Sequence, residues 1–190
     1  MRQQAKIDGI TEPVIFRETA RLHGLNTDRS DFERFAEALV AEHRGRVTDL
    51  RDRGRALPGA AAALNALAAC DVRQTVVSGN IRPVAEIKLR TFGLDQHILW
   101  DVGAYGEDNE VRADLVRLAL QRAGTAARDA VLIGDTPADV EAAIATDVPV
   151  IAVASGRSEE AALRAAGAEV VLPDLADTAL LVKLVCGHAG

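Results

Sequence analysis

The stretch that decides the fold, residues 131–140, reads VLIGDTPADV. Its first residues, Val131–Ile133, form a short apolar run of the kind that becomes a buried strand in a parallel sheet. A helix is expected to follow from Pro137. Asp135 and Asp139 therefore lie at the carboxyl end of a predicted strand, which is the edge where open α/β sheets bind ligands.

These carboxylates allow two interpretations. Hard oxygen ligands at such an edge suit Mg²⁺, which binds through a few carboxylates together with phosphate oxygens and water. Alternatively, Asp135 caps the following helix and Asp139 interacts with the helix dipole in the first turn, without a metal. The local sequence leaves both interpretations open.

Strands and helices alternate on both sides of this motif. Strands are predicted over residues 74–78, 98–102, 130–133, 148–153 and 169–172, and helices over 60–69, 83–91, 113–123, 137–145, 158–166 and 178–185. Parallel strands need crossover helices, which cover both faces of the sheet. The pattern predicts an α/β fold, a doubly wound Rossmann-like parallel sheet, over residues 57–190.

Residues 1–56 have a different pattern, which predicts a small and mostly helical segment. Pro13 suits the start of a first helix. Asp28 or Ser30 is expected to cap a second helix, in which apolar residues recur at helical spacing. We therefore expect two parts: the helical segment 1–56 and the α/β part 57–190.

The residues Ser78-Gly79-Asn80 directly follow another predicted strand. A hydroxyl, a flexible backbone and an amide at a strand end can together hold phosphate oxygens. The alternative is an ordinary turn in which Asn80 caps the next helix.

Composition excludes some classes of function. The formal net charge of −6 and the 3% of aromatic residues argue against a nucleic-acid-binding surface. No apolar run reaches the ~18 residues of a membrane span, and no apolar stretch follows the basic N-terminus as in a signal peptide. We expect a cytoplasmic protein that binds neither nucleic acid nor membrane; its oligomeric state is not indicated.

Taken in order and with their spacing, these pieces resemble the haloacid dehalogenase (HAD) superfamily. In that family a second strand ends in Ser or Thr, and an acidic motif follows a later strand. The matching stretches here are 57–59 (LPG), 76–80 (VVSGN), 88–89 (KL), 92–94 (FGL), 134–139 (GDTPAD) and 164–169 (RAAGAE). The resemblance extends from about residue 8 to residue 185, and it implies a HAD-like fold with a small α-helical cap over residues 1–56.

The resemblance implies roles at the two motifs. Ser78 would hydrogen-bond the transferring phosphoryl group, with Gly79 and Asn80 as further substrate-binding residues. Asp135 would bind Mg²⁺, and Asp139 would complete or support the metal shell. This acidic pair is typical of the phosphatase branch, whereas the dehalogenase relatives work without the metal.

A basic residue is also expected before the acidic motif, where the family usually has Lys-Pro. Arg112 is our candidate, because arginine can neutralise phosphoryl charge and contact phosphate oxygens bidentately. Lys88 is the less favoured candidate, since its helix position suits a solvated face. Arg112 could instead be a surface charge at a helix start.

The family's first, central strand, which ends in the nucleophile motif DxDGT, is apparently missing. The nearest stretch, Lys6–Thr11, has lysine in place of the nucleophile, and residues 8–13 are more similar to a cap segment of the family. Two buried strand edges would then lose their backbone partners, at on the order of 1–3 kcal/mol for each unsatisfied group. We expect the natural chain to start upstream of Met1.

These observations favour a magnesium-dependent phosphatase of small phosphate monoesters, similar to phosphoglycolate phosphatase, that forms an aspartyl-phosphate. Without its nucleophilic aspartate, the chain as written is expected to be inactive. The alternative is a non-catalytic HAD-like protein that binds a phosphorylated ligand or a partner protein.

Overall fold

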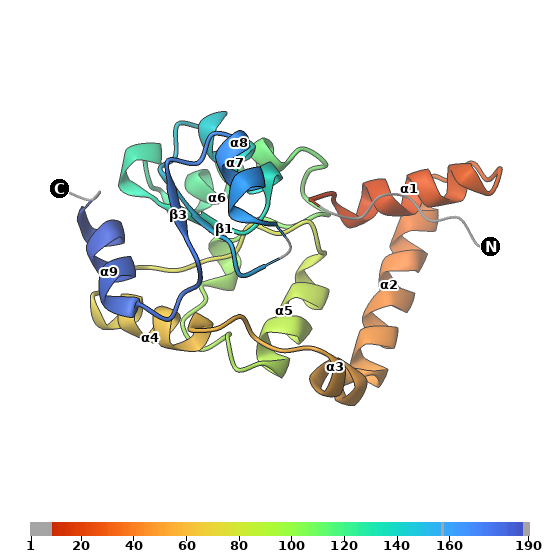
Figure 1. Ribbon diagram of the computed structural model, residues 1–190. Helices are drawn as coiled ribbons and strands as arrows, with labels where there is room; N and C mark the ends of the chain where they lie inside the picture. The colour runs from red at the N-terminus through yellow and green to blue at the C-terminus, as the bar shows by residue number, and fades with distance from the viewer. Residues whose placement is uncertain (1–8, 157, 188–190) are drawn as a thin grey trace.

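The structure, a computed structural model, describes residues 9–156 and 158–187 (Figure 1). Its helices are α1 (Glu12–Leu22), α2 (Arg29–Gly45), α3 (Val47–Arg53), α4 (Ala60–Ala69), α5 (Arg82–Thr91), α6 (Arg112–Ala123), α7 (Pro137–Ile144), α8 (Glu160–Ala165) and α9 (Thr178–Gly187). Its strands are β1 (Leu132–Gly134), β2 (Val150–Val153) and β3 (Val170–Leu172), and short 3-10 helices cover Trp100–Val102 and Ala127–Asp129.

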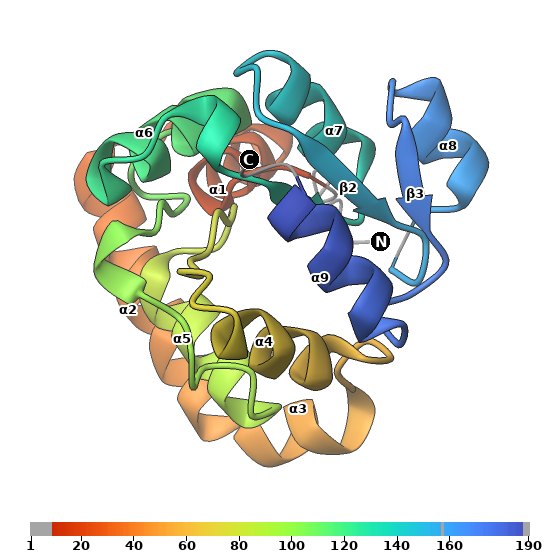
Figure 2. The same ribbon diagram turned by 90° about the vertical axis from the view of Figure 1, so that its left-hand side faces the viewer.

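The strands form a parallel sheet in the order β1-β2-β3, with helices on both faces. Successive residues of a strand point to opposite faces. Ile151 of β2 accordingly packs against α4 and α9, while its neighbour Ala152 packs against α7 and α8. Figure 2 shows α9 and α4 on one side of β2, and α7 on the other. The doubly wound α/β fold predicted from the sequence is confirmed.

Regular strands at 74–78 and 98–102 were wrong predictions. Here the backbone makes isolated parallel pairs, Gln74 with Ile98 and Val77 with Ala104. The 3-10 helix Trp100–Val102 interrupts the second segment, so the pairing cannot continue from one bridge to the next. The two segments still lie beside each other, as the prediction required.

Among the described residues, no backbone pair joins the 74–77 segment to the sheet: β1 pairs with β2 only. The connection is made by side chains, because Val77 and Leu132 pack against one cluster formed by Val116 of α6, Ala142 of α7 and Val148. Half of the nearest nucleophile-like stretch, Lys6–Thr11, lies outside the described residues, which begin at residue 9. The prediction of a missing central strand stays a prediction.

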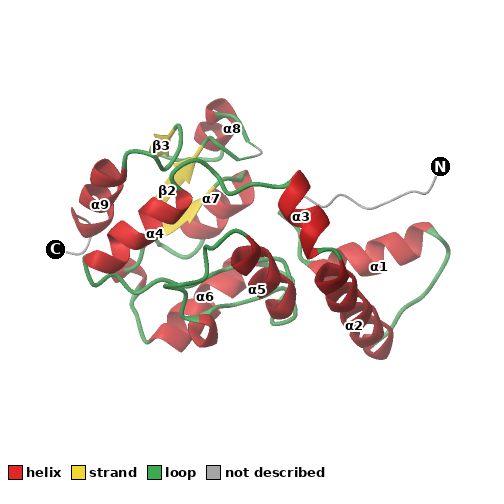
Figure 3. Cartoon of the chain, turned by 90° about the horizontal axis from the view of Figure 1, so that it is seen from below, coloured by secondary structure: helices red, strands yellow, loops and turns green. Residues whose placement is uncertain are grey.

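Helices α1 to α3 lie to one side of the sheet (Figures 1 and 3). Phe16 of α1 stacks on Phe35 of α2 with ring centroids 4.7 Å apart, and Phe32 completes this aromatic cluster. Both α2 and α3 contact α5. The helical segment thus has its own small apolar contact and is seated on the α/β part through α5.

Asp28, one of the two predicted caps, is the N-cap of α2. Its carboxylate accepts a hydrogen bond from the backbone N–H of Asp31 at 3.0 Å, and the Asp31 carboxylate accepts one from the backbone N–H of Asp28. This reciprocal arrangement satisfies donors that a helix start leaves unpaired.

Within the two stretches that the structure describes, no helix has the length and apolar character needed to cross a membrane.

Replacing Asp28 by Ala should lower the free energy of unfolding by about 1 kcal/mol, because the N-cap acceptor is lost. Urea denaturation followed by circular dichroism measures this. Glu37→Ala, at an exposed position of the same helix, should change the value by less than about half as much. Equal losses in both variants would show that the cap contributes nothing of its own.

Candidate functional site

The turn Ser78-Gly79-Asn80 is held by backbone hydrogen bonds from both sides. On one side, Ser78 N–H donates to the carbonyl of Ala104 at 3.0 Å, and Gly106 N–H donates to the carbonyl of Asn80 at 2.9 Å. On the other side, Glu12 N–H donates to the carbonyl of Gly79 at 2.8 Å. The turn is therefore clamped between the loop after Ala104 and the start of α1.

Within the turn, the Ser78 hydroxyl accepts a hydrogen bond from the backbone N–H of Asn80 at 3.1 Å. A hydroxyl has one donor hydrogen and two acceptor lone pairs. Since this contact uses an acceptor, the hydroxyl hydrogen of Ser78 can be donated to another group. A phosphate oxygen, which only accepts, is suited to be that partner.

Gly106 is needed for this packing. A Cβ atom at this position would overlap the carbonyl oxygen of Gly79 and come within 3.4 Å of the nitrogen of Glu12. A glycine is therefore required where the loop passes the turn.

The Asn80 side chain does not cap α5, so this alternative interpretation was wrong. The N-cap of α5 is Ile81, which makes no side-chain cap. Instead, the Asn80 Nδ2 donates to the Glu12 carboxylate at 2.9 Å, and the Asn80 Oδ1 accepts from Lys88 Nζ at 2.8 Å. Lys88 is half-buried, so its predicted place on a solvated face was also wrong.

Glu12 is a site residue that the sequence analysis missed. Its side chain is buried, and its second carboxylate oxygen accepts a hydrogen bond from the backbone N–H of Ile81 at 2.7 Å. Burial raises the pKa of Glu12 above its ordinary value. The hydrogen bond from Ile81, the charges of Lys88 and His43, and the hydrogen bond from Asn80 oppose this rise.

Arg112 and Asp139 form a largely buried ion pair. The Arg112 Nε and Nη2 both lie 2.6 Å from Asp139 Oδ1. Asp139 Oδ2 accepts hydrogen bonds from the Thr136 hydroxyl at 2.7 Å and the Thr136 N–H at 3.1 Å, and Thr136 is the N-cap of α7. Asp139 thus lies in the first turn of α7, as the interpretation without a metal predicted. That interpretation also made Asp135 the N-cap of α7, which is wrong, because Thr136 has this position. Arg112 is not a surface charge.

Asp135 follows β1 directly and is half-buried. Its carboxylate lies against the backbone of Gly156, where an added Cβ would overlap a carboxylate oxygen. Close by in the chain, the Ser155 hydroxyl is buried and has no hydrogen-bond partner within the described residues. This edge of the sheet therefore combines a carboxylate with an unsatisfied polar atom.

The fit to Mg²⁺ is partial. Asp135 offers a hard oxygen ligand, but both oxygens of Asp139 already accept hydrogen bonds from Arg112 and Thr136. In residues 9–156 and 158–187, no group of three or more His, Cys, Asp or Glu side chains could hold a metal ion. Mg²⁺ commonly keeps several waters and uses one or two carboxylates plus substrate phosphate. Asp135 fits that mode, with the remaining ligands coming from water and phosphate.

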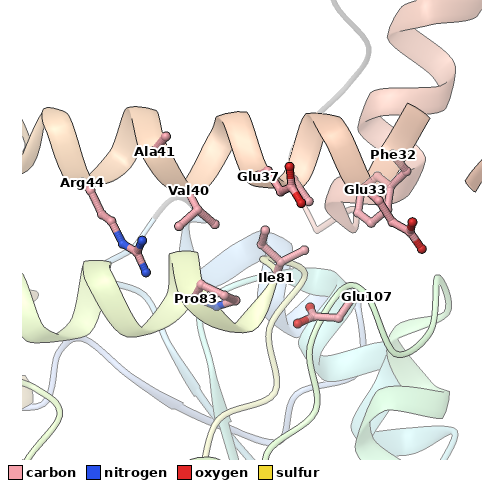
Figure 4. Close-up of a pocket in the computed structure, with 10 residues that line it drawn as sticks. Phe32, Glu33, Glu37, Val40, Ala41, Arg44, Ile81, Pro83 and Glu107 are labelled. Carbon is pink, nitrogen blue, oxygen red and sulfur yellow. The ribbon is translucent and has the colours of Figure 1, made fainter. Parts of the chain in front are cut away.

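A hollow of about 530 Å³ lies between the helical segment and the α/β part (Figure 4). It is lined by Phe32, Glu33, Ala36, Glu37, Val40, Ala41 and Arg44 of α2, by Ile81 and Pro83 at the start of α5, and by Glu107. Ser78, Arg112 and Asp135 are not among the lining residues. The hollow meets the candidate site only at Ile81, the residue whose N–H is bound by Glu12.

Replacing Asp139 by Asn should lower the free energy of unfolding by about 2–4 kcal/mol, because a guanidinium that is largely out of water loses its counter-charge. Chemical denaturation measures this loss. Asp129→Asn, at an exposed position, is the matched control and should have little effect. A loss below about 1 kcal/mol, the usual value for surface pairs, would contradict a structural role for the ion pair.

The raised pKa of Glu12 should appear in the pH dependence of stability. Above the ordinary value of 4.5 the native state retains the proton longer than the unfolded chain. The stability that Glu12 contributes is therefore full below about pH 4.5 and is lost as the pH rises through the raised pKa. Measured by urea denaturation, the stability advantage of the wild type over Glu12→Gln should shrink toward neutral pH. An advantage that grows with pH would contradict this, and Glu18→Gln on the same helix should follow the wild-type curve.

Comparison with known proteins identifies the family. The family model described as haloacid dehalogenase-like hydrolase matches residues 7–143, more than half of the chain, and a second model of the same kind matches residues 112–178. A phosphoglycolate phosphatase from Rhodospirillum rubrum is 36% identical over 121 residues, which are 63% of this chain and 49% of that protein. The chain thus aligns with about half the length of this curated relative.

Solved structures share the fold. A hydrolase from Pseudomonas syringae superimposes with a TM-score of 0.70 and 22% identity, over 94% of this chain and 80% of that one. CbbY from Rhodobacter sphaeroides, solved in complex with xylulose-(1,5)bisphosphate, gives a TM-score of 0.56 and 20% identity, over 85% and 86% of the two chains. These structures share the fold, and the family model that matches residues 7–143 shows that the chain belongs to the haloacid dehalogenase-like hydrolase family.

Proposed function

We propose that this chain is the phosphate-binding part of a magnesium-dependent phosphatase that acts on small phosphate monoesters, such as phosphoglycolate-like substrates. The observation that carries the proposal is the Ser78-Gly79-Asn80 turn. It is clamped on both sides, and the Ser78 hydroxyl is left with a hydrogen to donate. The similarity to a phosphoglycolate phosphatase supports the substrate class.

The residues around the turn have distinct roles in this proposal. Ser78 donates to a phosphoryl oxygen, with Gly79 and Asn80 forming the rest of the turn that receives the phosphate. Asp135 holds Mg²⁺, which when bound supplies charge neutralisation for the phosphoryl oxygens. Residues 1–56 act as a cap that covers the substrate and limits the access of water.

Arg112 has a double role. Its Nε and Nη2 hold Asp139, and a guanidinium carries further N–H donors beyond these. The remaining N–H groups and the positive charge of the guanidinium favour phosphate binding, while the ion pair keeps the side chain in place. Asp139 supports the metal ligand Asp135 indirectly, by fixing the start of α7 that follows it.

The sequence contains no DxDGT motif, so the nucleophile that would form an aspartyl-phosphate is not supplied by this chain. We infer that the chain binds phosphate but does not hydrolyse phosphate esters. The same observation favours a second candidate function, a non-catalytic protein that binds a phosphorylated ligand.

Calorimetric titration with tungstate, a phosphate mimic, in the presence of Mg²⁺ tests the binding site. Ser78→Ala should weaken binding about tenfold, as loss of one hydrogen bond to a charged ligand predicts. Asp135→Asn should remove the dependence of binding on Mg²⁺. Ser30→Ala and Asp129→Asn, both at exposed positions, are the matched controls.

Unchanged tungstate affinity in Ser78→Ala would overturn the proposed phosphate site. Hydrolysis of p-nitrophenyl phosphate tests the inferred inactivity of the chain. Magnesium-stimulated turnover by the wild type that Asp135→Asn abolishes would contradict the inferred inactivity.

A further inference from the structure

Three polar side chains form a directed chain of hydrogen bonds from α5 to α1. The ammonium of Lys88 can only donate, so the Asn80 Oδ1 must face it. The Asn80 Nδ2 is thereby turned to Glu12, which accepts at one carboxylate oxygen while the other accepts from the N–H of Ile81. Both oxygens of Glu12 are used as acceptors, which is the pattern of an ionised carboxylate.

The middle residue of these three, Asn80, also contacts the hydroxyl proposed to bind phosphate. Asn80, whose side chain Glu12 and Lys88 hold from opposite sides, donates its backbone N–H to Ser78 Oγ. Glu12 also holds the turn directly through the hydrogen bond from its own N–H to the carbonyl of Gly79. One residue of α1 therefore acts on the turn through both its backbone and its side chain.

We infer that Glu12 is a positioning residue that acts through Asn80 to keep the Ser78 hydroxyl oriented as a donor to phosphate. Because Glu12 opens α1, phosphate affinity then depends on how the N-terminal helical segment is seated on the α/β part. The inference rests on the proposed function. It names Glu12 as the residue through which the helical segment affects phosphate affinity at that same site.

The charges around Glu12 agree with this role. Lys88 of α5 and His43 of α2 stabilise its negative charge, and the charge of Glu107, on the loop after Ala104, opposes that of Glu12. Glu107 itself accepts from the N–H of Arg82. At the start of α5, the N–H of the N-cap residue Ile81 thus donates to a carboxylate of α1, and the N–H of Arg82 donates to one of the neighbouring loop. Both segments are therefore tied to the same helix start.

A double-mutant cycle on tungstate affinity tests whether Glu12 acts through Ser78. Glu12→Gln should weaken binding about fivefold in the wild-type background, but less than about twofold when Ser78→Ala is already present, because coupled residues are not additive. Glu18→Gln, further along α1, is the control and should leave affinity unchanged. A merely structural Glu12 would give the same fold-change in both backgrounds, which would overturn the inference.

The outcomes of this cycle separate the two proposals. If Ser78→Ala leaves tungstate binding unchanged, the proposed function fails. If Ser78→Ala weakens binding and Glu12→Gln does not, the positioning role fails while the phosphate site stands.

A second variant tests the direction of the hydrogen bonds and keeps the inference testable if Glu12→Gln folds poorly. In either orientation, the Gln amide would point an N–H at another donor, of Asn80 or of Ile81. Adding Asn80→Asp provides an acceptor for both Lys88 and the new amide, so thermal stability should recover in Glu12→Gln/Asn80→Asp. A double variant less stable than Glu12→Gln would contradict the directed chain.

Discussion

The ion pair between Arg112 and Asp139 connects the helix beside the 74–77 segment with the helix beside β1, and within the described residues these two segments share no strand pairing. Arg112 opens α6, which packs on Val77 and Ala104. Asp139 lies in the first turn of α7, which packs on β2. The relative placement of the Ser78 turn and the Asp135 edge therefore depends on how these two helices are held together.

Apolar packing supports the same junction. Val116 of α6 and Ala142 of α7 share one cluster with Val77 and Leu132. Side-chain packing therefore joins these segments, as a ladder of backbone hydrogen bonds joins neighbouring strands elsewhere in a sheet. Side-chain packing is less directional than a ladder, whereas an arginine held at Nε and Nη2 is geometrically specific. The ion pair thus supplies the orientation and the cluster supplies most of the burial.

The parts of the fold that the sequence predicted are those governed by local pattern. The strand ending at Gly134, the helices from residue 60 onward and the cap at Asp28 follow from apolar runs and capping chemistry over a few residues. The segments 74–78 and 98–102 failed as regular strands because strand formation depends on partners distant in the sequence. A local apolar run does not reveal whether those partners are present.

In the candidate site, too, residues placed by local pattern were predicted, and a residue placed by contacts distant in the sequence was not. Ser78 and Asp135 stand next to strand ends and were found by that position, but Glu12 was missed. It lies 68 residues before Asn80 along the chain, and an acidic residue before a proline at a helix start has an ordinary explanation as a first-turn charge. Its burial and its bonds to Asn80 and Ile81 come only from the seating of α1 on α5.

The two carboxylates of the acidic motif illustrate why a motif does not assign equal roles to its members. Asp139 is buried, and its oxygens accept hydrogen bonds from Arg112 and from the helix cap. Moving this carboxylate toward a metal would leave a guanidinium without its counter-charge, at a cost of several kcal/mol. Asp135 lies half-buried at the sheet edge, with its carboxylate against the backbone of Gly156. In the proposed function, Asp135 is therefore the metal ligand, and Asp139 keeps the start of α7 in place.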